Sequence, residues 1–294
     1  QASILAVIAA GQTLVLLVRG IDLSVGAVMT LAMVIVARMS GNMGDPLWPG
    51  LVAVLIFGLV VGSANAFLVV IRRVPPFVAT LAIAVLIVGA QTAWTQGVPG
   101  GEVPKGLANL GTTRWLGIAS VTVIGLGLII ALALLLRFTV LGRWIRSTGA
   151  NPEAARTAGV PVLGVTAAMY VACALLAVLG GLLLGGYVGY VDGYLGAGYD
   201  LDSIAAAVIG GTSFAGGRGG VVRSLVGAFV IAGALNMIVL TGADEWLQLV
   251  VKGAVIIVAV AVQGIQWRTG KSRSRNSAGS SAQQPNQARV AAQS

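Results

Sequence analysis

Carboxylates and hydroxyls stand at two places where an apolar run of the sequence restarts. Two similar motifs, Gly20-Ile-Asp-Leu-Ser24 and Gly198-Tyr-Asp-Leu-Asp202, carry these residues. Short side-chain acceptors suit such positions, because they satisfy the free N–H groups of a helix start, which lipid cannot do. We therefore predict that four residues cap broken helices: Asp22, Ser24, Asp200 and Asp202. The alternative is that these residues line a transport route.

Uncharged polar side chains recur inside the apolar runs and offer a second kind of chemistry. Such groups usually bond neighbouring helices to one another, but they also suit a path for a neutral polyhydroxyl solute. The candidate path residues are Asn65, Thr80, Gln91, Asn236 and Gln248. A buried charge, Lys252, would cost about 2.5–3.5 kcal/mol if it were unpaired at the bilayer centre. We expect Lys252 to reach the membrane surface or to pair with Asp200 or Asp202.

Catalytic and cofactor chemistry find little support in the sequence. The chain has no histidine and one cysteine, Cys173, which removes histidine-based catalysis, most metal sites and any intrachain disulfide. Residues 264–272 resemble a phosphate-binding loop, but five residues rather than four separate Gly264 from Gly270, and an apolar run precedes them instead of a strand. We predict no enzymatic activity, cofactor, metal or ATP site, so a partner chain must supply any ATP hydrolysis.

The composition places these residues in a membrane. Of the 294 residues, 57% are hydrophobic and 9% charged, and the mean hydropathy is +0.95. Runs of about 20 apolar residues recur, which is the length that a bilayer core of about 30 Å requires of a helix. The net charge of +9 is concentrated in a central loop and the C-terminal tail, which indicates membrane topology rather than nucleic-acid binding. We predict an all-α polytopic membrane protein embedded in the lipid bilayer.

The apolar runs divide the chain into spans and loops. We predict a transmembrane domain over residues 1–267 and a disordered cytoplasmic tail over residues 268–294. Because residue 1 opens directly into an apolar run, we also expect an earlier span before it. Residues 97–114 and 185–198 are predicted as glycine-rich loops. The predicted spans are 3–18, 25–39, 51–71, 77–94, 115–136, 162–184, 221–240 and 246–262, with 201–209 as a helix too short to cross.

The two Gly-x-Asp-Leu motifs belong to a predicted internal repeat. Gly62-Ser-Ala-Asn65 and Gly233-Ala-Leu-Asn236 also match, each midway along the span that follows. When the basic loops are placed in the cytoplasm, the two Asp motifs face opposite sides of the membrane. We therefore predict inverted-repeat halves with broken helices, over residues of about 20–94 and 198–265, which would place a pathway at their interface.

Residues 137–161 form a long soluble, basic and helix-prone stretch between the spans, and we place it in the cytoplasm. Asn151 suits the N-cap and Gly159, with a positive φ, the end of a short helix over residues 152–158. Such a helix favours docking of a soluble partner, whereas the alternative is an ordinary loop. The candidate docking residues are Arg143, Glu153, Ala154, Ala155, Arg156 and Gly159.

Several motifs, in a fixed order, resemble the bacterial ribose-type ABC sugar transporter permeases. The first is Gly20-Ile-Asp-Leu-Ser-Val-Gly26, and the second is Leu141-Gly-Arg-Trp-Ile with the stretch from Gly149 to Gly159. The third runs from Tyr199 to Ser213 and continues with Gly216-Gly-Arg-Gly219. The resemblance covers residues of about 6–262, and its specificity lies in the ordered set rather than in any one motif.

This resemblance implies a permease of the bacterial inner membrane that moves a monosaccharide from the periplasm to the cytoplasm. It implies four binding partners: a cytoplasmic ATP-binding subunit, a periplasmic sugar-binding protein, a second permease copy and the sugar itself. Residues 141–159 would then correspond to the coupling loop that contacts the ATPase. Two alternatives stay open, namely a branched-chain amino-acid ABC permease, which shares the architecture, and a self-sufficient secondary transporter.

Overall fold

The computed structural model describes residues 1–41, 45–98, 102–240, 242, 247, 250–254 and 257. The chain divides into two compact units, Gln1–Asp244 and Glu245–Ser294. The first unit contains every helix and strand named below. In the second unit, residues 250–254 are helical and include Lys252. Gln248, the predicted tail and most of the predicted span 246–262 lie outside the described residues.

Five helices of the described chain are long and apolar enough to cross a membrane. They are α3 (Trp48–Ala66) with its π-helical continuation η1 (Phe67–Ile71), α4 (Pro76–Thr95), α6 (Ser120–Phe138), α9 (Val162–Val188) and α11 (Val221–Leu240). Two apolar helices are shorter, α1 (Ala2–Leu17) and α2 (Val25–Ser40). Large apolar side chains stay exposed along α3, α4, α6 and α11, as in helices that face lipid. The predicted all-α polytopic membrane protein is confirmed.

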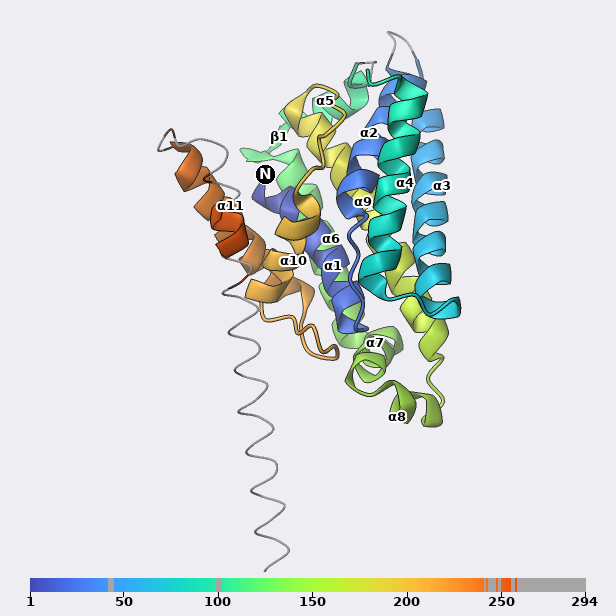
Figure 1. Ribbon diagram of the computed structural model, residues 1–294. Coiled ribbons are helices and arrows are strands. Elements are labelled where there is room, and N and C mark those ends of the chain that lie inside the picture. Colours follow the sequence, from blue (N-terminus) through green and yellow to red (C-terminus); the bar gives the residue numbers. More distant parts are fainter. Residues whose placement is uncertain are drawn as a thin grey trace, which may run out of the picture. The chain divides into compact units, whose positions relative to one another are not determined.

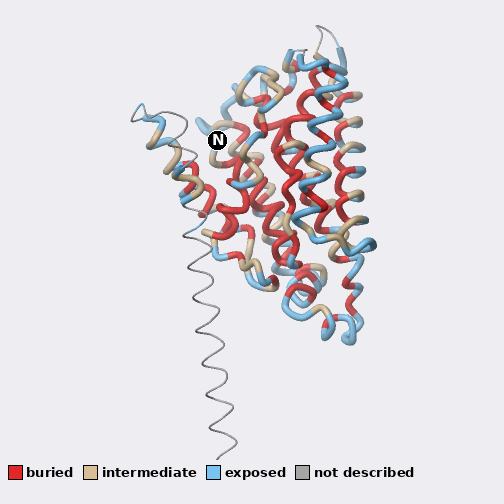
Figure 2. The backbone as a smooth tube through the Cα atoms, viewed as in Figure 1, coloured by how far each residue is buried: buried red, intermediate tan, exposed pale blue. Residues whose placement is uncertain are grey.

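Helix α1 forms the core of the first unit. Its sequence is apolar on all sides, and every residue from Ser3 to Leu17 is buried, as expected of a helix covered all round. Helices α6, α9 and α11 pack against it, together with the short helix α10 (Tyr199–Ile209), and Figure 2 shows the buried stretch. Sixteen residues span about 24 Å, which is less than a bilayer core of about 30 Å. Protein rather than lipid therefore surrounds α1.

The two broken helices, α2 and α10, begin next to each other inside the bundle. The N–H of Gly196, just before α10, donates to Thr30 Oγ1 of α2 over 2.9 Å. A Cβ on Gly26 would lie 2.6 Å from the Gly196 carbonyl oxygen, so the backbones touch there. From this point α2 and α10 run toward opposite ends of the first unit (Figure 1). This opposed pair fits the predicted inverted repeats, whose boundaries stay a prediction.

Three stretches differ from the predicted loops and spans. The supposed loop 97–114 contains helix α5 (Lys105–Thr112), and α9 continues past residue 184 to Val188. The predicted span from residue 115 begins instead with a hairpin, β1 (Arg114–Trp115) paired with β2 (Ile118–Ala119). Its two turn residues, Leu116 and Gly117, have φ values of 53° and 82°, which matches the right-handed twist of a two-residue hairpin. Helix α6 therefore starts only at Ser120.

The central stretch holds two helices rather than one, α7 (Val140–Ala150) and α8 (Pro152–Thr157). They lie at one end of the first unit with the C-terminus of α1, whereas α5 and the hairpin lie at the other end (Figure 1). Segments at the α7–α8 end carry Arg19, Arg72, Arg73, Arg137, Arg143, Arg146, Arg156, Arg218 and Arg223, and those at the other end carry Arg38, Lys105 and Arg114. This segregation fits the positive-inside rule with α8 in the cytoplasm.

Candidate functional site

Helix α8 is short and is closed at both ends by local hydrogen bonds. Asn151 Oδ1 accepts from the N–H groups of Glu153 and Ala154, each over 3.1 Å. At the other end Gly159, with φ of 82°, donates to the Arg156 carbonyl over 3.0 Å. The next N–H, from Val160, reaches back to the Ala155 carbonyl over 3.0 Å, which completes a Schellman motif. The predicted cap and the predicted positive φ are confirmed, and the helix ends at Thr157 rather than at 158.

The candidate docking residues differ in their exposure. Arg143 on α7 is exposed, as are four residues on and after α8: Glu153, Ala154, Arg156 and Gly159. Ala155 is the exception, since only 4% of it is exposed. The expectation that Ala155 gives a partner a small surface to approach is therefore wrong, because its methyl group packs within this chain. A bulky residue there would disturb the position of α8 itself.

Arg19 joins the C-terminus of α1 to the junction of α7 and α8. Its Nε donates to the Gly149 carbonyl and its Nη2 to the Ala150 carbonyl, both over 2.7 Å. These carbonyls end helix α7, where a cation is also favoured by the helix dipole. We call residues 149–153 the elbow. Nothing in the sequence signalled this contact, because Arg19 simply follows an apolar run.

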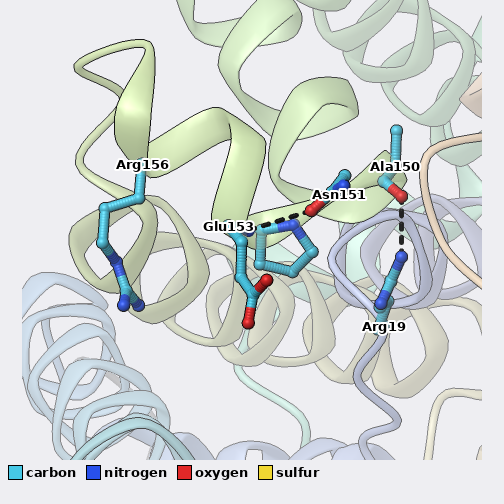
Figure 3. Close-up of a pocket in the computed structure, with 6 residues that line it drawn as sticks. Arg19, Ala150, Asn151, Glu153 and Arg156 are labelled. Atoms are coloured by element: carbon cyan, nitrogen blue, oxygen red, sulfur yellow. Dashed lines mark hydrogen bonds between the residues drawn. The ribbon is translucent and has the colours of Figure 1, made fainter.

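The loop that follows α10 completes the packing around the elbow. The N–H of Gly217 donates to the Leu17 carbonyl over 2.9 Å. A Cβ on Gly149 would lie 1.7 Å from that same carbonyl oxygen and 2.4 Å from the Gly217 nitrogen, so only glycine fits. Beside this contact lies an open cavity of about 530 Å³, shown in Figure 3. Its lining residues are Arg19, Ala150, Asn151, Pro152, Glu153 and Arg156.

A buried polar cluster surrounds Asp22, on the segment between α1 and α2. Asp22 Oδ1 accepts from the Ser24 N–H over 2.8 Å and from Ser24 Oγ over 2.6 Å. Asn65 Nδ2 on α3 donates to Ser24 Oγ over 2.9 Å, and Thr80 Oγ1 on α4 accepts the Leu23 N–H over 3.0 Å. Side chains of α3 and α4 therefore hold this non-helical segment in place.

Gln12 on α1 completes the Asp22 cluster. In the amide orientation that satisfies both groups, Gln12 donates to the Asp22 carbonyl over 3.1 Å and accepts the Asp22 N–H over 3.2 Å. A helix that must leave the α-helical path inside a membrane needs such substitutes for its lost backbone bonds. The side chains named above that hydrogen-bond within this cluster are uncharged apart from Asp22 itself.

The predicted helix caps are wrong in detail. Ser24 occupies the N-cap position of α2 but makes no side-chain cap bond, and Asp22 bonds to Ser24 before the helix starts. Asp22 thus closes a turn on its own segment, a common role for Asp. The N-cap of α10 is Gly198, with φ of 84°. Asp200 and Asp202 instead lie within the first turn, where negative charge is favoured by the helix dipole.

Comparison with known proteins identifies the family of this bundle. Residues 1–260 match the family model described as "Branched-chain amino acid transport system / permease component". The chain belongs to this permease family. No solved structure matches it.

Curated relatives of the permease are named for sugar uptake. It is 36% identical over 270 residues to the ribose import permease protein RbsC of Escherichia coli (strain K12), covering 89% of this chain and 83% of that protein. It is 37% identical over 266 residues to RbsC of Bacillus subtilis (strain 168), covering 88% and 81%. The galactose/methyl galactoside import permease protein MglC of Haemophilus influenzae is 30% identical over 289 residues, covering 92% and 86%.

Three of the predicted path residues form hydrogen bonds to other parts of the permease. Asn65 and Thr80 belong to the cluster around Asp22 described above. Gln91 Nε2 donates to the Gly193 carbonyl over 3.0 Å and so ties α4 to the loop after α9. All three therefore bond one part of the permease to another, which is the commoner use of polar groups in membrane helices.

The remaining predicted site residues lie on or after α11. Asn236 on α11 is exposed and lines a cavity of the first unit. Gln248 lies outside the described residues. Lys252 is half-buried within the second unit, and its pairing with Asp200 or Asp202 stays a prediction.

Proposed function

We propose that this chain is the membrane-spanning permease subunit of an ATP-driven importer in the bacterial inner membrane, and that it moves a neutral monosaccharide from the periplasm to the cytoplasm. The observation that carries this proposal is the similarity to ribose import permeases over more than four fifths of their length. The membrane-crossing helices and the segregated basic residues support the location and orientation.

An ATP-binding subunit is proposed to dock on the α7–α8 end. The elbow is exposed at Glu153 and α8 at Arg156. The Arg19 side chain bonds to the elbow, and the backbones of Leu17 and Gly217 pack closely against Gly149. A six-residue helix such as α8 is too short to be stable alone. The caps of α8 and the Arg19 hydrogen bonds hold this helix in a fixed position, so that a movement of the ATPase could be transmitted through it to the helix bundle. Arg143, Glu153, Ala154, Arg156 and Gly159 are the proposed contact residues.

A periplasmic sugar-binding protein is proposed to deliver the substrate at the opposite end, and a second permease copy to complete the pathway. Large apolar side chains of α11, among them Val230 and Met237, remain exposed in the single chain. They supply area that lipid or a second copy would cover.

The substrate is proposed to be a sugar rather than an amino acid because most buried polar side chains are uncharged. Amides and hydroxyls exchange hydrogen bonds readily with sugar hydroxyls. A free amino acid carries an ammonium and a carboxylate, and burying these charges needs paired partners. The family description favours branched-chain amino acids as the second candidate, so transport assays must include both.

The test is transport by the complete complex. We expect proteoliposomes that hold this permease, its ATP-binding subunit and its binding protein to import D-ribose or D-galactose only when ATP is supplied to the cytoplasmic face. The purified permease alone should hydrolyse no ATP. Uptake of leucine without any sugar would favour the amino-acid permease, and ATP-independent uptake by this chain alone would favour a secondary transporter.

A further inference from the structure

A second cavity, of about 450 Å³, opens between the start of α1 and helices α6, α9 and α11. Six of its lining residues carry the argument: Gln1, Ser3, Thr122, Tyr187, Phe229 and Asn236. Figure 1 shows α11 diverging from the bundle beside the start of α1 and away from α7 and α8. Under the proposed orientation, the cavity lies in the periplasmic half of the permease.

Only half of α11 packs into the bundle, and the other half forms one wall of the cavity. The buried residues of α11 end at Ala232, and a Cβ on Gly227 would lie 2.0 Å from the Ala206 carbonyl oxygen, so α10 and α11 pack closely there. Beyond that contact α11 separates from α1 and α6, and Asn236 lies on the separated half. On the opposite wall, Ser3 Oγ and Thr122 Oγ1 approach each other at 3.5 Å and link α1 to α6.

The lining combines two kinds of group that a sugar needs. Amides of Gln1 and Asn236 and hydroxyls of Ser3, Thr122 and Tyr187 both donate and accept hydrogen bonds. The rings of Tyr187 and Phe229 are 45% and 50% exposed, and they offer apolar faces on which the C–H face of a sugar ring can stack. The volume lies in the range of small-molecule sites. By contrast, the cavity at the elbow is lined by charged Arg19, Glu153 and Arg156.

Asn236 also differs from the other polar residues within the membrane helices. Asn65, Thr80 and Gln91 are hydrogen-bonded to other parts of the fold. No described residue forms a hydrogen bond with the Asn236 side chain, which lines the cavity instead. The amide oxygen and nitrogen of Asn236 are exposed on the cavity wall, so both can bond to a ligand there.

We infer that this cavity is a binding subsite for a neutral monosaccharide on the permease itself, with Asn236 as its hydrogen-bonding anchor and Tyr187 and Phe229 as its stacking surfaces. The inference rests on the proposed function and adds the place where the sugar first contacts the permease. It also predicts discrimination, because an amino acid of similar size would place two charges against uncharged groups.

Thiol labelling tests the subsite directly. The chain has one cysteine, Cys173, which is buried, so an introduced cysteine becomes the reactive one. We expect D-ribose or D-galactose at ten times its Kd to slow maleimide labelling of Asn236→Cys in the assembled complex about tenfold, while leucine has no effect. Thr122→Cys, on the opposite wall, should be protected in the same way. Val98→Cys, 67% exposed and outside the cavity, should label at the same rate with and without sugar.

Transport by a second variant separates this inference from the proposed function. Asn236→Leu keeps the size of the side chain and removes the amide, so we expect the KM for sugar uptake to rise while the permease level in the membrane stays unchanged. If the unmodified complex imports sugar but neither cysteine is protected and Asn236→Leu imports normally, the subsite is wrong and the proposed function stands. Failure of the unmodified complex to import any sugar overturns both.

Discussion

Replacing Arg19 should uncouple ATP hydrolysis from sugar import. Its two hydrogen bonds, each 2.7 Å long, hold the carbonyls of Gly149 and Ala150 at the elbow. A hydrogen bond from a charged donor contributes about 1.5–3 kcal/mol when buried. The bond to Gly149 is only partly buried and that to Ala150 is exposed, so we expect about 1–2 kcal/mol for both together after solvent screening. Losing this free energy would raise the population of the released elbow, relative to the bound elbow, about 5–30-fold.

The choice of substituent matters because Arg19 has a positive φ of 67°. Asn tolerates this left-handed backbone better than other non-glycine residues, so Arg19→Asn removes the guanidinium with little added strain. Arg19→Lys keeps the charge but cannot reproduce the planar fork that serves two carbonyls. We expect both variants to reach the membrane, with Arg19→Asn impaired more severely than Arg19→Lys.

The assay compares sugar uptake with ATP hydrolysis in the same proteoliposomes, so that the readout is sugar imported per ATP. This ratio should fall several-fold for Arg19→Asn, while ATPase activity without binding protein changes little. The matched control is Arg72→Asn, which removes an exposed charge from the same end of the fold. If Arg19→Asn and Arg72→Asn both import the normal amount of sugar per ATP, the elbow does not depend on Arg19 and the reasoning fails.

Three further substitutions test other features. Gly159→Val forces a β-branched residue into φ of 82° at the end of α8, so we expect sharply reduced uptake and reduced stimulation of the partner ATPase at a normal membrane level; normal values for both would show that α8 is not the coupling element. Gly149→Ala places a Cβ 1.7 Å from the Leu17 carbonyl oxygen, so the melting temperature of the purified permease should fall, and an unchanged melting curve would contradict the close contact. Asn65→Leu removes the donor to the buried Ser24 hydroxyl, which should destabilise the permease by about 1–3 kcal/mol, whereas Asn109→Leu on the exposed surface should be close to neutral.

Features set by neighbouring residues were predictable from the sequence. The N-cap at Asn151 and the positive φ at Gly159 follow from local rules, and both are present. The long apolar spans follow from hydropathy. Helix α7 was not predicted as a separate helix, although residues 137–161 are helix-prone and Thr139 caps its start. The hairpin was missed because the apolar run at residue 115 masked its turn at Leu116 and Gly117.

Contacts between distant residues had no such signal. Arg19 and Gly149 are 130 positions apart, and Asn65 and Ser24 are 41 apart. Residue type alone therefore could not show that Asn65 is hydrogen-bonded within the fold while Asn236 lines a cavity. Asp200 and Asp202 were placed at the correct helix but in the wrong role, because Gly198 begins the helix with a backbone conformation rather than with a side-chain bond.

The complete burial of α1 has a consequence for the way the permease is made. The ribosome synthesises α1 long before α9, α10 and α11, which later cover it, and Thr13 of α1 bonds to Ser224, 211 positions further along the chain. Until those helices enter the membrane, Gln12 and Thr13 must face lipid or bind a transient protein companion. Long-range closure of this kind is slow, and partly finished chains expose surfaces that quality-control proteases can recognise. A weakened contact between α1 and these later helices would therefore lower the amount of permease, because α1 would stay uncovered for longer.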